Sequence, residues 1–421
     1  MAGRLKAVPD ASRDLISELP LEVKDRILGC LRTPEAARTV MLSKHWNDVW
    51  LQHGRLTFDW EFLQCVERCY DDEGITLVNI INNILFFRAE PVKKFTLRIS
   101  SDDPRAQQSY FDRWCLFLSR NGVEELNICL DTDEEEYKLP FCLLYCRTIK
   151  QLIVRGPFID LPVNACGIFS NVTSLVFCKV EFKRSVNGIA SSISIPKLEK
   201  LAFGFCRGIN KFEISPPKLE MLCVIDYILE VKSRWLAPHL KVIKTLWLCG
   251  SSLWHMDVSV FPTAINLQVM KLYDLDFGCR KQLAVALQLL QKCLNLCELH
   301  IIAYKSCWKD DKEDASRLLE EPNSGFVIQE LKMLNTIKIE SFREFSLEML
   351  FMKMLLSKSP ALERVVIVKS WGMNASEVKI QRKLECFPRA SPNAQIFYAG
   401  NYHTSMRDDW SDTHGFSLYE I

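Results

Sequence analysis

Two cysteine-containing segments come nearest to the spacing of a metal site. In "CLLYC", Cys142 to Cys146, two thiols stand four residues apart, and "CLNLCELH", Cys293 to His300, adds a histidine to such a pair. Thiolates and imidazoles are zinc ligands, but a structural zinc site needs a second ligand pair, which neither segment has. Buried thiols acting as small core residues explain both segments better, and we expect no metal.

The acidic run "DTDEEE", Asp131 to Glu136, imitates the start of a calcium loop but lacks the turn glycine at the sixth position. It is predicted to be a solvated loop. The chain also lacks a Gly-x-Ser-x-Gly elbow, a phosphate-binding P-loop and a Gly-x-Gly-x-x-Gly turn. The sequence therefore predicts a protein that is not an enzyme, with no catalytic residue and no cofactor.

The composition is that of a globular protein. Of 421 residues, 48% are hydrophobic and 25% charged, and the formal net charge is +1. No basic segment stands out, which argues against a nucleic-acid partner. The most apolar run, Ile75 to Phe87, is short and broken by Asn79, Asn82 and Asn83, so no membrane partner is expected.

Cysteine usage and the start of the chain bear on localisation. The 17 cysteines are odd in number and scattered singly along apolar stretches, which is typical of a reducing compartment. The start, "MAGRLKAVPD", lacks the apolar region of a secretory signal. We expect a cytoplasmic and/or nuclear protein.

A repeated pattern, Leu-x-x-Leu-x-Leu or close to it, runs through most of the chain. Most of its intervals lie near the 20 to 29 residues of leucine-rich repeats. The central apolar residue of each of the eleven instances is its anchor, and the anchors are Phe95, Leu126, Leu152, Leu175, Leu201, Leu222, Leu246, Met270, Leu299, Ile337 and Val365.

Each repeat is predicted to supply one short parallel strand whose leucines point into a stacked core. The expected fold is α/β, a curved solenoid with parallel strands on its concave face and helical or irregular returns. The segment Arg280 to Cys293 has helical apolar spacing and is assigned to one return. An ordinary α/β protein with leucine-rich strands is the alternative. Residues 305–325, dense in both charge signs, are predicted to be a solvated insertion.

Residues one and three positions after an anchor should face away from this core. Trp247, Lys271, Tyr273 and His300 then come from three successive strands, with Cys249 beside them, and Arg98 and Arg155 from earlier ones. Their aromatic and cationic character suits a binding hot spot, so they are the candidate substrate-binding residues. The alternative is that they are ordinary surface residues.

The segment Ser17 to Trp50 predicts three short helices. Pro20 and the pair Thr33-Pro34 mark two helix starts, with Thr33 as the predicted cap of the second helix, and Ser43 is placed to cap the third. So small a unit rarely stabilises itself. Its apolar faces fit either a cap on the first repeat or an interface with another protein, and the pattern alone does not decide between them.

This segment resembles an F-box. The resemblance rests on Leu19-Pro20, Ile27-Leu28 and "LSKHWNDVW" from Leu42 to Trp50, although His45 stands where plant members usually have Arg. The segment Glu330 to Val368, followed by Lys383 to Tyr398, resembles the FBD region of plant F-box/FBD/leucine-rich-repeat proteins. The predicted domains are a tail (1–12), the F-box (13–60), the repeat solenoid (61–329), the FBD-like region with the last two repeats (330–400) and a second tail (401–421).

The resemblance implies a substrate receptor of a Skp, cullin and F-box ubiquitin ligase. Its partners would be a Skp-type adaptor, the cullin and RING subunits reached through that adaptor, and an unknown target protein. The adaptor contacts carried over by the resemblance are Leu19, Pro20, Val23, Ile27, Leu28, Val40, Leu42 and Trp46, while Trp50 is assigned to the internal core. The alternative is a repeat scaffold or small-molecule-responsive binding protein whose F-box-like head is only a cap.

Overall fold

The computed structural model of the chain describes most of its residues. The described ranges are 16–69, 77–100, 107–131, 137–162, 165–183, 191–209, 212–225, 233–304, 329–343, 345–369 and 377–399. The predicted insertion at 305–325, both predicted tails and most of the acidic run after Asp131 lie outside these ranges. The chain divides into two compact units, Met1–Leu152 and Ile153–Ile421, which are described separately.

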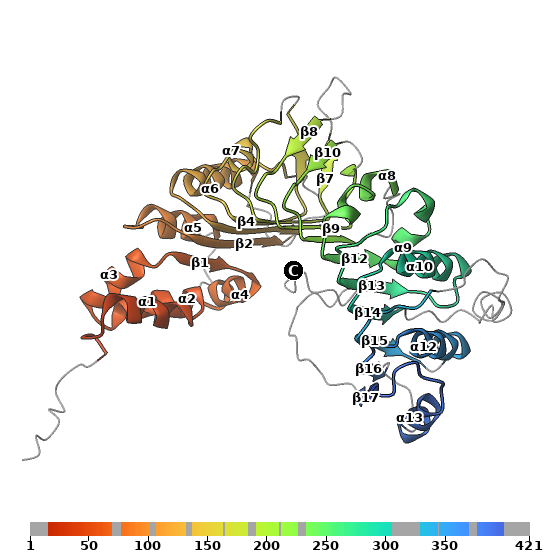
Figure 1. Cartoon of the computed structure of the whole chain (residues 1–421). Coiled ribbons are helices and arrows are strands. Elements are labelled where there is room, and N and C mark those ends of the chain that lie inside the picture. Colours follow the sequence, from red (N-terminus) through yellow and green to blue (C-terminus); the bar gives the residue numbers. More distant parts are fainter. Residues whose placement is uncertain are drawn as a thin grey trace, which may run out of the picture. The chain divides into compact units, whose positions relative to one another are not determined.

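The first unit begins with short helices and continues with helices between parallel strands (Figure 1). Strands β1, β2 and β3 lie side by side in that order, all parallel. The elements are α1 (Leu21–Gly29), α2 (Thr33–Arg38), η1 (Thr39–Met41), α3 (Lys44–Gln52), β1 (Arg55–Phe58), α4 (Trp60–Cys69), α5 (Leu77–Phe86), β2 (Lys94–Ser100), α6 (Gln108–Arg120), β3 (Glu125–Asp131), α7 (Phe141–Leu144) and β4 (Gln151–Arg155), whose first residues close the unit.

The second unit is a succession of parallel strands with helical or irregular returns. Its elements are β5 (Phe158–Asp160), β6 (Ser174–Cys178), β7 (Glu181–Lys183), β8 (Ser191–Ser194), β9 (Lys200–Gly204), β10 (Phe212–Ser215), β11 (Met221–Ile225), α8 (Ser233–Leu236), η3 (His239–Lys241), β12 (Thr245–Cys249), α9 (Gly250–Leu253), η4 (Val258–Val260), β13 (Val269–Leu275), α10 (Arg280–Lys292), β14 (Glu298–Ala303), β15 (Thr336–Phe342), α12 (Ser346–Lys358), β16 (Arg364–Lys369), α13 (Glu377–Glu385) and β17 (Gln395–Ala399).

The large sheet of this unit follows the order β6-β9-β11-β12-β13-β14-β15-β16-β17. Helices α10, α12 and α13 all lie on one side of the strands that they connect (Figure 1). Earlier returns instead form two small sheets, β8 with β10 and β5 with β7. The chain is thus a mixed α/β protein built around parallel strands, as the repeat pattern predicted.

The strand prediction is confirmed at the level of single residues. Every predicted anchor lies in a strand of its own and is buried. The pairing register aligns anchor with anchor, for example Leu222 with Leu246 and Leu246 with Met270. The same inward row continues into two strands that the pattern missed, because Leu56 of β1 pairs with Phe95 and Ile396 of β17 pairs with Val365.

The return that was predicted to be a helix can be compared with the structure. The helix expected from Arg280 is α10, which ends at Lys292. The return between β15 and β16 is also helical and contains α12, which runs from Ser346 to Lys358. Helix α13 and strand β17 follow the two repeats predicted for the FBD-like region, so this region contributes a third strand to the sheet.

Two helix starts of the first unit can be compared with the predicted capping. Ser43 caps α3, since its hydroxyl accepts a hydrogen bond from the Trp46 N–H at 3.4 Å. The predicted cap at Thr33 is wrong. Helix α2 begins at Thr33 itself, and the buried Thr33 hydroxyl accepts from the Thr57 N–H at 2.8 Å. That hydrogen bond links α2 to β1. The Thr33 hydroxyl is used there because a buried backbone N–H such as that of Thr57 needs an acceptor.

Candidate functional site

The N-terminal helices close around a small core of their own. Leu28, Ala36, Trp46 and Val49 are buried there. Lys24 lies against this core, with its Nζ 6.0 Å from the centre of the Trp46 ring. A helical unit of this size can bury only a few side chains in its core. Most of its remaining apolar side chains therefore stay outside that core.

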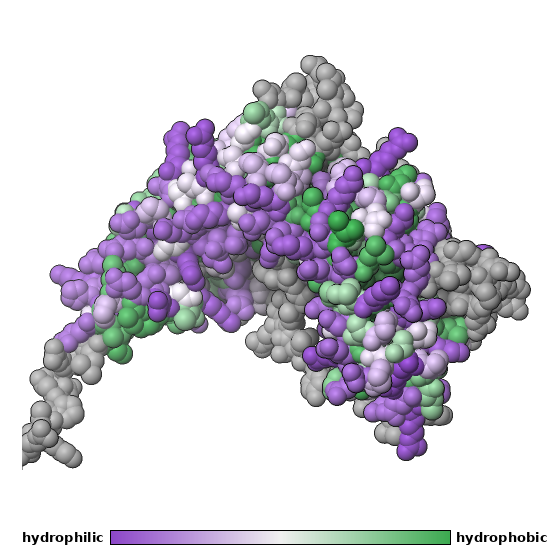
Figure 2. Space-filling view, viewed as in Figure 1, coloured by the Kyte–Doolittle hydropathy of each residue, from purple (hydrophilic) through white to green (hydrophobic). Residues whose placement is uncertain are grey.

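Those remaining side chains form the N-terminal apolar surface, which we define by its exposed large hydrophobic residues. Met41 is 85% exposed and Leu42 67%, values unusual for side chains of this size. Figure 2 shows hydrophobic residues gathered over helices α1 and α2, next to hydrophilic ones. The members of this surface are Ile16, Leu21, Val23, Leu31, Met41 and Leu42.

The predicted adaptor contacts divide into two groups. Pro20, Val23 and Leu42 are exposed, and Leu19, Ile27 and Val40 are half-buried, so all six side chains are accessible to a partner. Leu28 and Trp46 are buried, and the expectation that they are available to a partner is corrected.

The correction has a physical cause. Leu28 lies on α1 and Trp46 on α3, and these two helices pack on each other. Four further members of the apolar surface were not among the predicted contacts, namely Ile16, Leu21, Leu31 and Met41. The sequence could have indicated these four residues, because each is an apolar residue outside the narrow stripe that a short helix buries.

A half-buried arginine joins these helices to the segment before β2. Arg88 Nη1 donates to the carbonyl oxygens of Trp50 and His53, and its guanidinium carbon lies 4.2 Å from the centre of the Trp50 ring. Burial lowers the Arg88 pKa to about 10, which leaves it protonated at neutral pH. The end of α3 is therefore held by a cation that stacks on its tryptophan.

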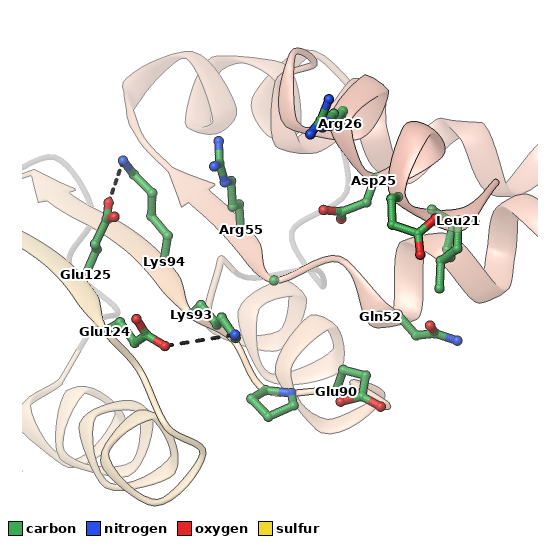
Figure 3. A pocket seen from close by; sticks show the side chains of 14 residues that line it. Leu21, Asp25, Arg26, Gln52, Arg55, Glu90, Lys93, Lys94, Glu124 and Glu125 are labelled. Atoms are coloured by element: carbon green, nitrogen blue, oxygen red, sulfur yellow. Dashed lines mark ion pairs between the residues drawn. The ribbon is translucent and has the colours of Figure 1, made fainter. Parts of the chain in front are cut away.

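The first unit also contains a polar pocket that the sequence did not predict (Figure 3). Its cavity of about 570 Å³ lies between α1, the end of α3 and the starts of β1, β2 and β3. Two ion pairs line it, Lys94 to Glu125 at 2.9 Å and Lys93 to Glu124 at 3.9 Å. The charged side chains that line the pocket carry both signs, and several of them are already paired.

The predicted substrate-binding residues come together in the second unit. Trp247, Lys271 and His300 are in register on β12, β13 and β14, and the Lys271 Nζ lies 4.2 Å from the centre of the Trp247 ring. Arg155 lies on β4 at the start of the same unit, whereas Arg98 lies on β2 of the first unit.

Their expected exposure is corrected. Trp247 is only 9% exposed, and Lys271, Tyr273, Cys249 and Arg155 are also buried. Trp247 and Tyr273 belong to an apolar cluster on this face of the sheet, which also includes Val176, Ala202, Met221, Cys223, Ile225 and Cys249.

The sequence held a signal for this burial. Strands such as "MLCVI" and "TLWLC" have no polar residue at their outward positions. Parallel strands buried on both faces read as continuous hydrophobic runs in this way. We define the strand face as the side of the sheet that bears the residues one and three positions after each anchor. Over β6 to β12 it is a second core.

Further along the sheet the strand face becomes polar and accessible. His300 Nε2 lies 2.8 Å from Glu340 Oε1, and Lys338 Nζ lies 2.5 Å from the same oxygen. Burial lowers the pKa of His300, and this effect outweighs the opposing hydrogen bond and charge of Glu340; Lys271 and Lys338 lower the pKa slightly further. Chiefly the His300 hydrogen bond, with help from Lys338, lowers the pKa of Glu340 to about 2. A neutral imidazole beside a carboxylate and an ammonium is the arrangement at neutral pH.

The cysteines of the two zinc-like segments are free thiols. Cys146 and Cys293 are buried, and burial raises the Cys293 pKa to about 12, which disfavours the thiolate that binds metals. Among the described residues, no three His, Cys, Asp or Glu side chains are grouped to hold a metal ion. Nor does any helix in the described ranges have the length and apolar character to cross a membrane.

The sequence of the chain is similar to those of known proteins. Residues 88–304 match the family described as "At1g61320/AtMIF1, LRR domain". F-box/FBD/LRR-repeat protein At1g13570 of Arabidopsis thaliana is 27% identical over 434 residues, covering 92% of this chain and 99% of that protein. Putative F-box protein At3g58860 of the same plant is 30% identical over 247 residues, covering 52% of each. Parallel repeat strands and these matches agree: the chain belongs to the plant family of F-box, FBD and leucine-rich-repeat proteins.

Proposed function

We propose that the chain is the substrate-receptor subunit of a Skp, cullin and F-box ubiquitin ligase. In this proposal residues 13–60 are the F-box, which binds a Skp-type adaptor, and the repeats form a curved solenoid that binds a target protein. The N-terminal apolar surface carries the proposal, because six exposed large hydrophobic side chains on one small helical unit are typical of a protein interface. The F-box names of the relatives support the same partner class.

The chain would act by proximity and would supply no chemistry of its own. Holding a target near an enzyme that carries activated ubiquitin raises the effective concentration of the target's lysines. The adaptor, together with the cullin and RING subunits, would bring the bound target close to that enzyme. A cytoplasmic and/or nuclear location belongs to the same proposal.

The apolar surface also predicts the character of the interface. Met41 and Leu42 follow one another where η1 ends, before Ser43 caps the next helix, so both lie at the turn between η1 and α3. Interface cores are built from such apolar residues surrounded by a polar rim. Here exposed charged residues of α1, such as Glu22 and Arg26, would supply part of that rim.

Co-purification with a purified Skp-type adaptor tests the proposal. Wild-type chain should retain the adaptor, and the double variant Met41→Asp with Leu42→Asp should lose it, because two carboxylates would be buried without partners. Leu19→Ala with Pro20→Ala should weaken it at the other end of the helical segment. Ile265→Asp is the control, since Ile265 is also an exposed apolar residue, at 56%, and lies in the second unit.

Two outcomes would contradict the proposal. One is a wild-type chain that retains no adaptor, and the other is a Met41 and Leu42 double variant that retains as much as the Ile265 control. Either result favours the reading of the N-terminal helices as a cap on a repeat scaffold.

A further inference from the structure

The accessible part of the strand face lies on β14 to β17, and its residues fall in register. Lys338 of β15 pairs with Val366 of β16, which pairs with Phe397 of β17. The three side chains therefore stand in one row on one face, on strands that follow one another in the sheet (Figure 1). Phe397 is 45% exposed and Lys338 42%, in contrast to the buried row that begins at Trp247.

The charges on this face from β13 to β16 do not balance. Lys271, Lys338 and Arg364 are cations, Glu298 and Glu340 are carboxylates, and His300 is neutral because burial lowers its pKa. The formal sum is +1. A single positive charge on a partly buried surface favours an anionic ligand group.

Lys338 is the cation best placed to meet such a group. Its ammonium has three N–H donors and approaches Glu340 through one of them, at 2.5 Å. Lys271 is buried, with its Nζ over the Trp247 ring, and Arg364 lies with its guanidinium carbon 5.5 Å from the centre of the Phe397 ring. An incoming anion therefore finds accessible donors at Lys338 and a cationic border at Arg364.

Beside Lys338 the same row turns apolar. Val366 is half-buried, and the exposed Phe397 ring lies beyond it. Phenylalanine and arginine are both enriched at protein interfaces, and here an exposed phenylalanine lies next to an arginine. The row thus offers a cationic position followed by an apolar one.

We propose that this face binds an extended segment of the target protein that carries an aspartate or glutamate and, two residues away, an apolar side chain. The carboxylate would meet Lys338, and the apolar side chain would cover Val366 and Phe397. Neighbouring strands are about 4.8 Å apart, so the apolar positions lie about 5 to 10 Å from Lys338. Residues i and i+2 of an extended chain share one face and are about 6.6 Å apart, which matches that span.

A carboxylate fits this site better than a phosphate. One net positive charge matches a singly charged group, whereas a phosphate dianion calls for further unshared cations. Glu340 already shows that a carboxylate is accommodated between His300 and Lys338. The inference rests on the proposed role of the repeats as the target-binding part, and it gives that role a chemical specificity.

Selection from a library of short random peptides displayed on phage tests the inference on the purified full-length chain. Enriched peptides should contain Asp or Glu two residues from an aliphatic or aromatic residue. A synthetic peptide with this motif should bind the Lys338→Glu variant about tenfold or more weakly, because a charge-assisted contact becomes a repulsion. Lys353→Glu is the matched control: it makes the same charge change on α12 of the same repeat and should leave binding within about twofold.

Several results would overturn the inference. They are the absence of enriched peptides, enrichment of peptides without the acidic residue, equal binding by the Lys338 and Lys353 variants, and about tenfold tighter binding of a phosphoserine version of the peptide. Thermal unfolding of both variants checks that they fold. Adaptor binding by the same preparation is measured separately, so failure of the adaptor interaction cannot be confused with failure of the peptide site.

Discussion

The N-terminal helices and the strand face of β12 and β13 carry similar residues and use them in opposite ways. On the helices, Met41 and Leu42 are exposed although they are apolar. On the strands, Lys271 is buried although it is charged, in the same row as Trp247. Residue type alone therefore does not separate interface from core. A short helix buries only one narrow stripe, whereas a strand in a parallel sheet is buried on both faces wherever its neighbours are also apolar.

The largest loss of stability should come from replacing Trp247, which the structure places in a buried apolar cluster. Trp247→Ala removes a buried aromatic side chain and should lower the free energy of unfolding by about 3–5 kcal/mol, measured by urea unfolding followed by circular dichroism. A surface tryptophan would lose far less. A loss of unfolding free energy below about 1 kcal/mol would indicate that Trp247 is a surface residue, and its contrast with the exposed Met41 would disappear.

Thr33→Val tests the link between the helices and β1. The change keeps the shape of the side chain but leaves the Thr57 N–H without its acceptor, so the free energy of unfolding should fall by about 1–3 kcal/mol. Thr39→Val is the control, because the Thr39 hydroxyl donates only within the local helical segment, to the Ala36 carbonyl. Equal losses in the two variants in urea unfolding would argue against the link.

Glu340→Gln tests the polar end of the strand face, where we expect a loss of about 1 kcal/mol at pH 7. The folded-state pKa of Glu340, about 2, lies below its ordinary value of 4.5, so its stabilisation is present above pH 4.5 and is lost as pH falls toward 2. The gap between variant and wild type in urea unfolding should therefore narrow across that window. A gap that stays constant with pH would mean that the carboxylate is not held by His300 and Lys338.

Met41→Ala should have the smallest effect on stability. An exposed side chain loses little when it is truncated, so the free energy of unfolding should stay within about 0.5 kcal/mol of wild type. Leu28→Ala in the same helices should cost about 2–5 kcal/mol. If both variants unfold at the same urea concentration, the boundary between core and apolar surface has been drawn in the wrong place.

Much of the fold was predictable because the repeat imposes a strict alternation. Each strand anchor, from Phe95 to Val365, had to point inward for a single repeat to bury itself against its neighbours, and the pairing register follows from that requirement. Strands β1 and β17 escaped prediction because "RLTF" and "QIFYA" are short and lack the full leucine pattern. The predicted domain boundaries remain predictions.

The candidate site was predicted less well, since side-chain burial depends on neighbours that are distant in sequence. Leu28 and Trp46 fit the interface pattern as well as Leu42 does, and only the packing of α1 on α3 separates them. Glu340, forty residues after His300, cannot be paired with it from sequence spacing alone. The pairing depends on the register of β14 with β15.

Hydrogen–deuterium exchange of the full-length chain, with and without a Skp-type adaptor, tests the central claim most directly. The account predicts that the adaptor slows exchange in peptides covering residues 16–52 and leaves the peptides of β12 to β17 unchanged. Unchanged exchange in 16–52 in the presence of bound adaptor, or protection confined to the repeat strands, would contradict the assignment of the N-terminal apolar surface as the adaptor interface.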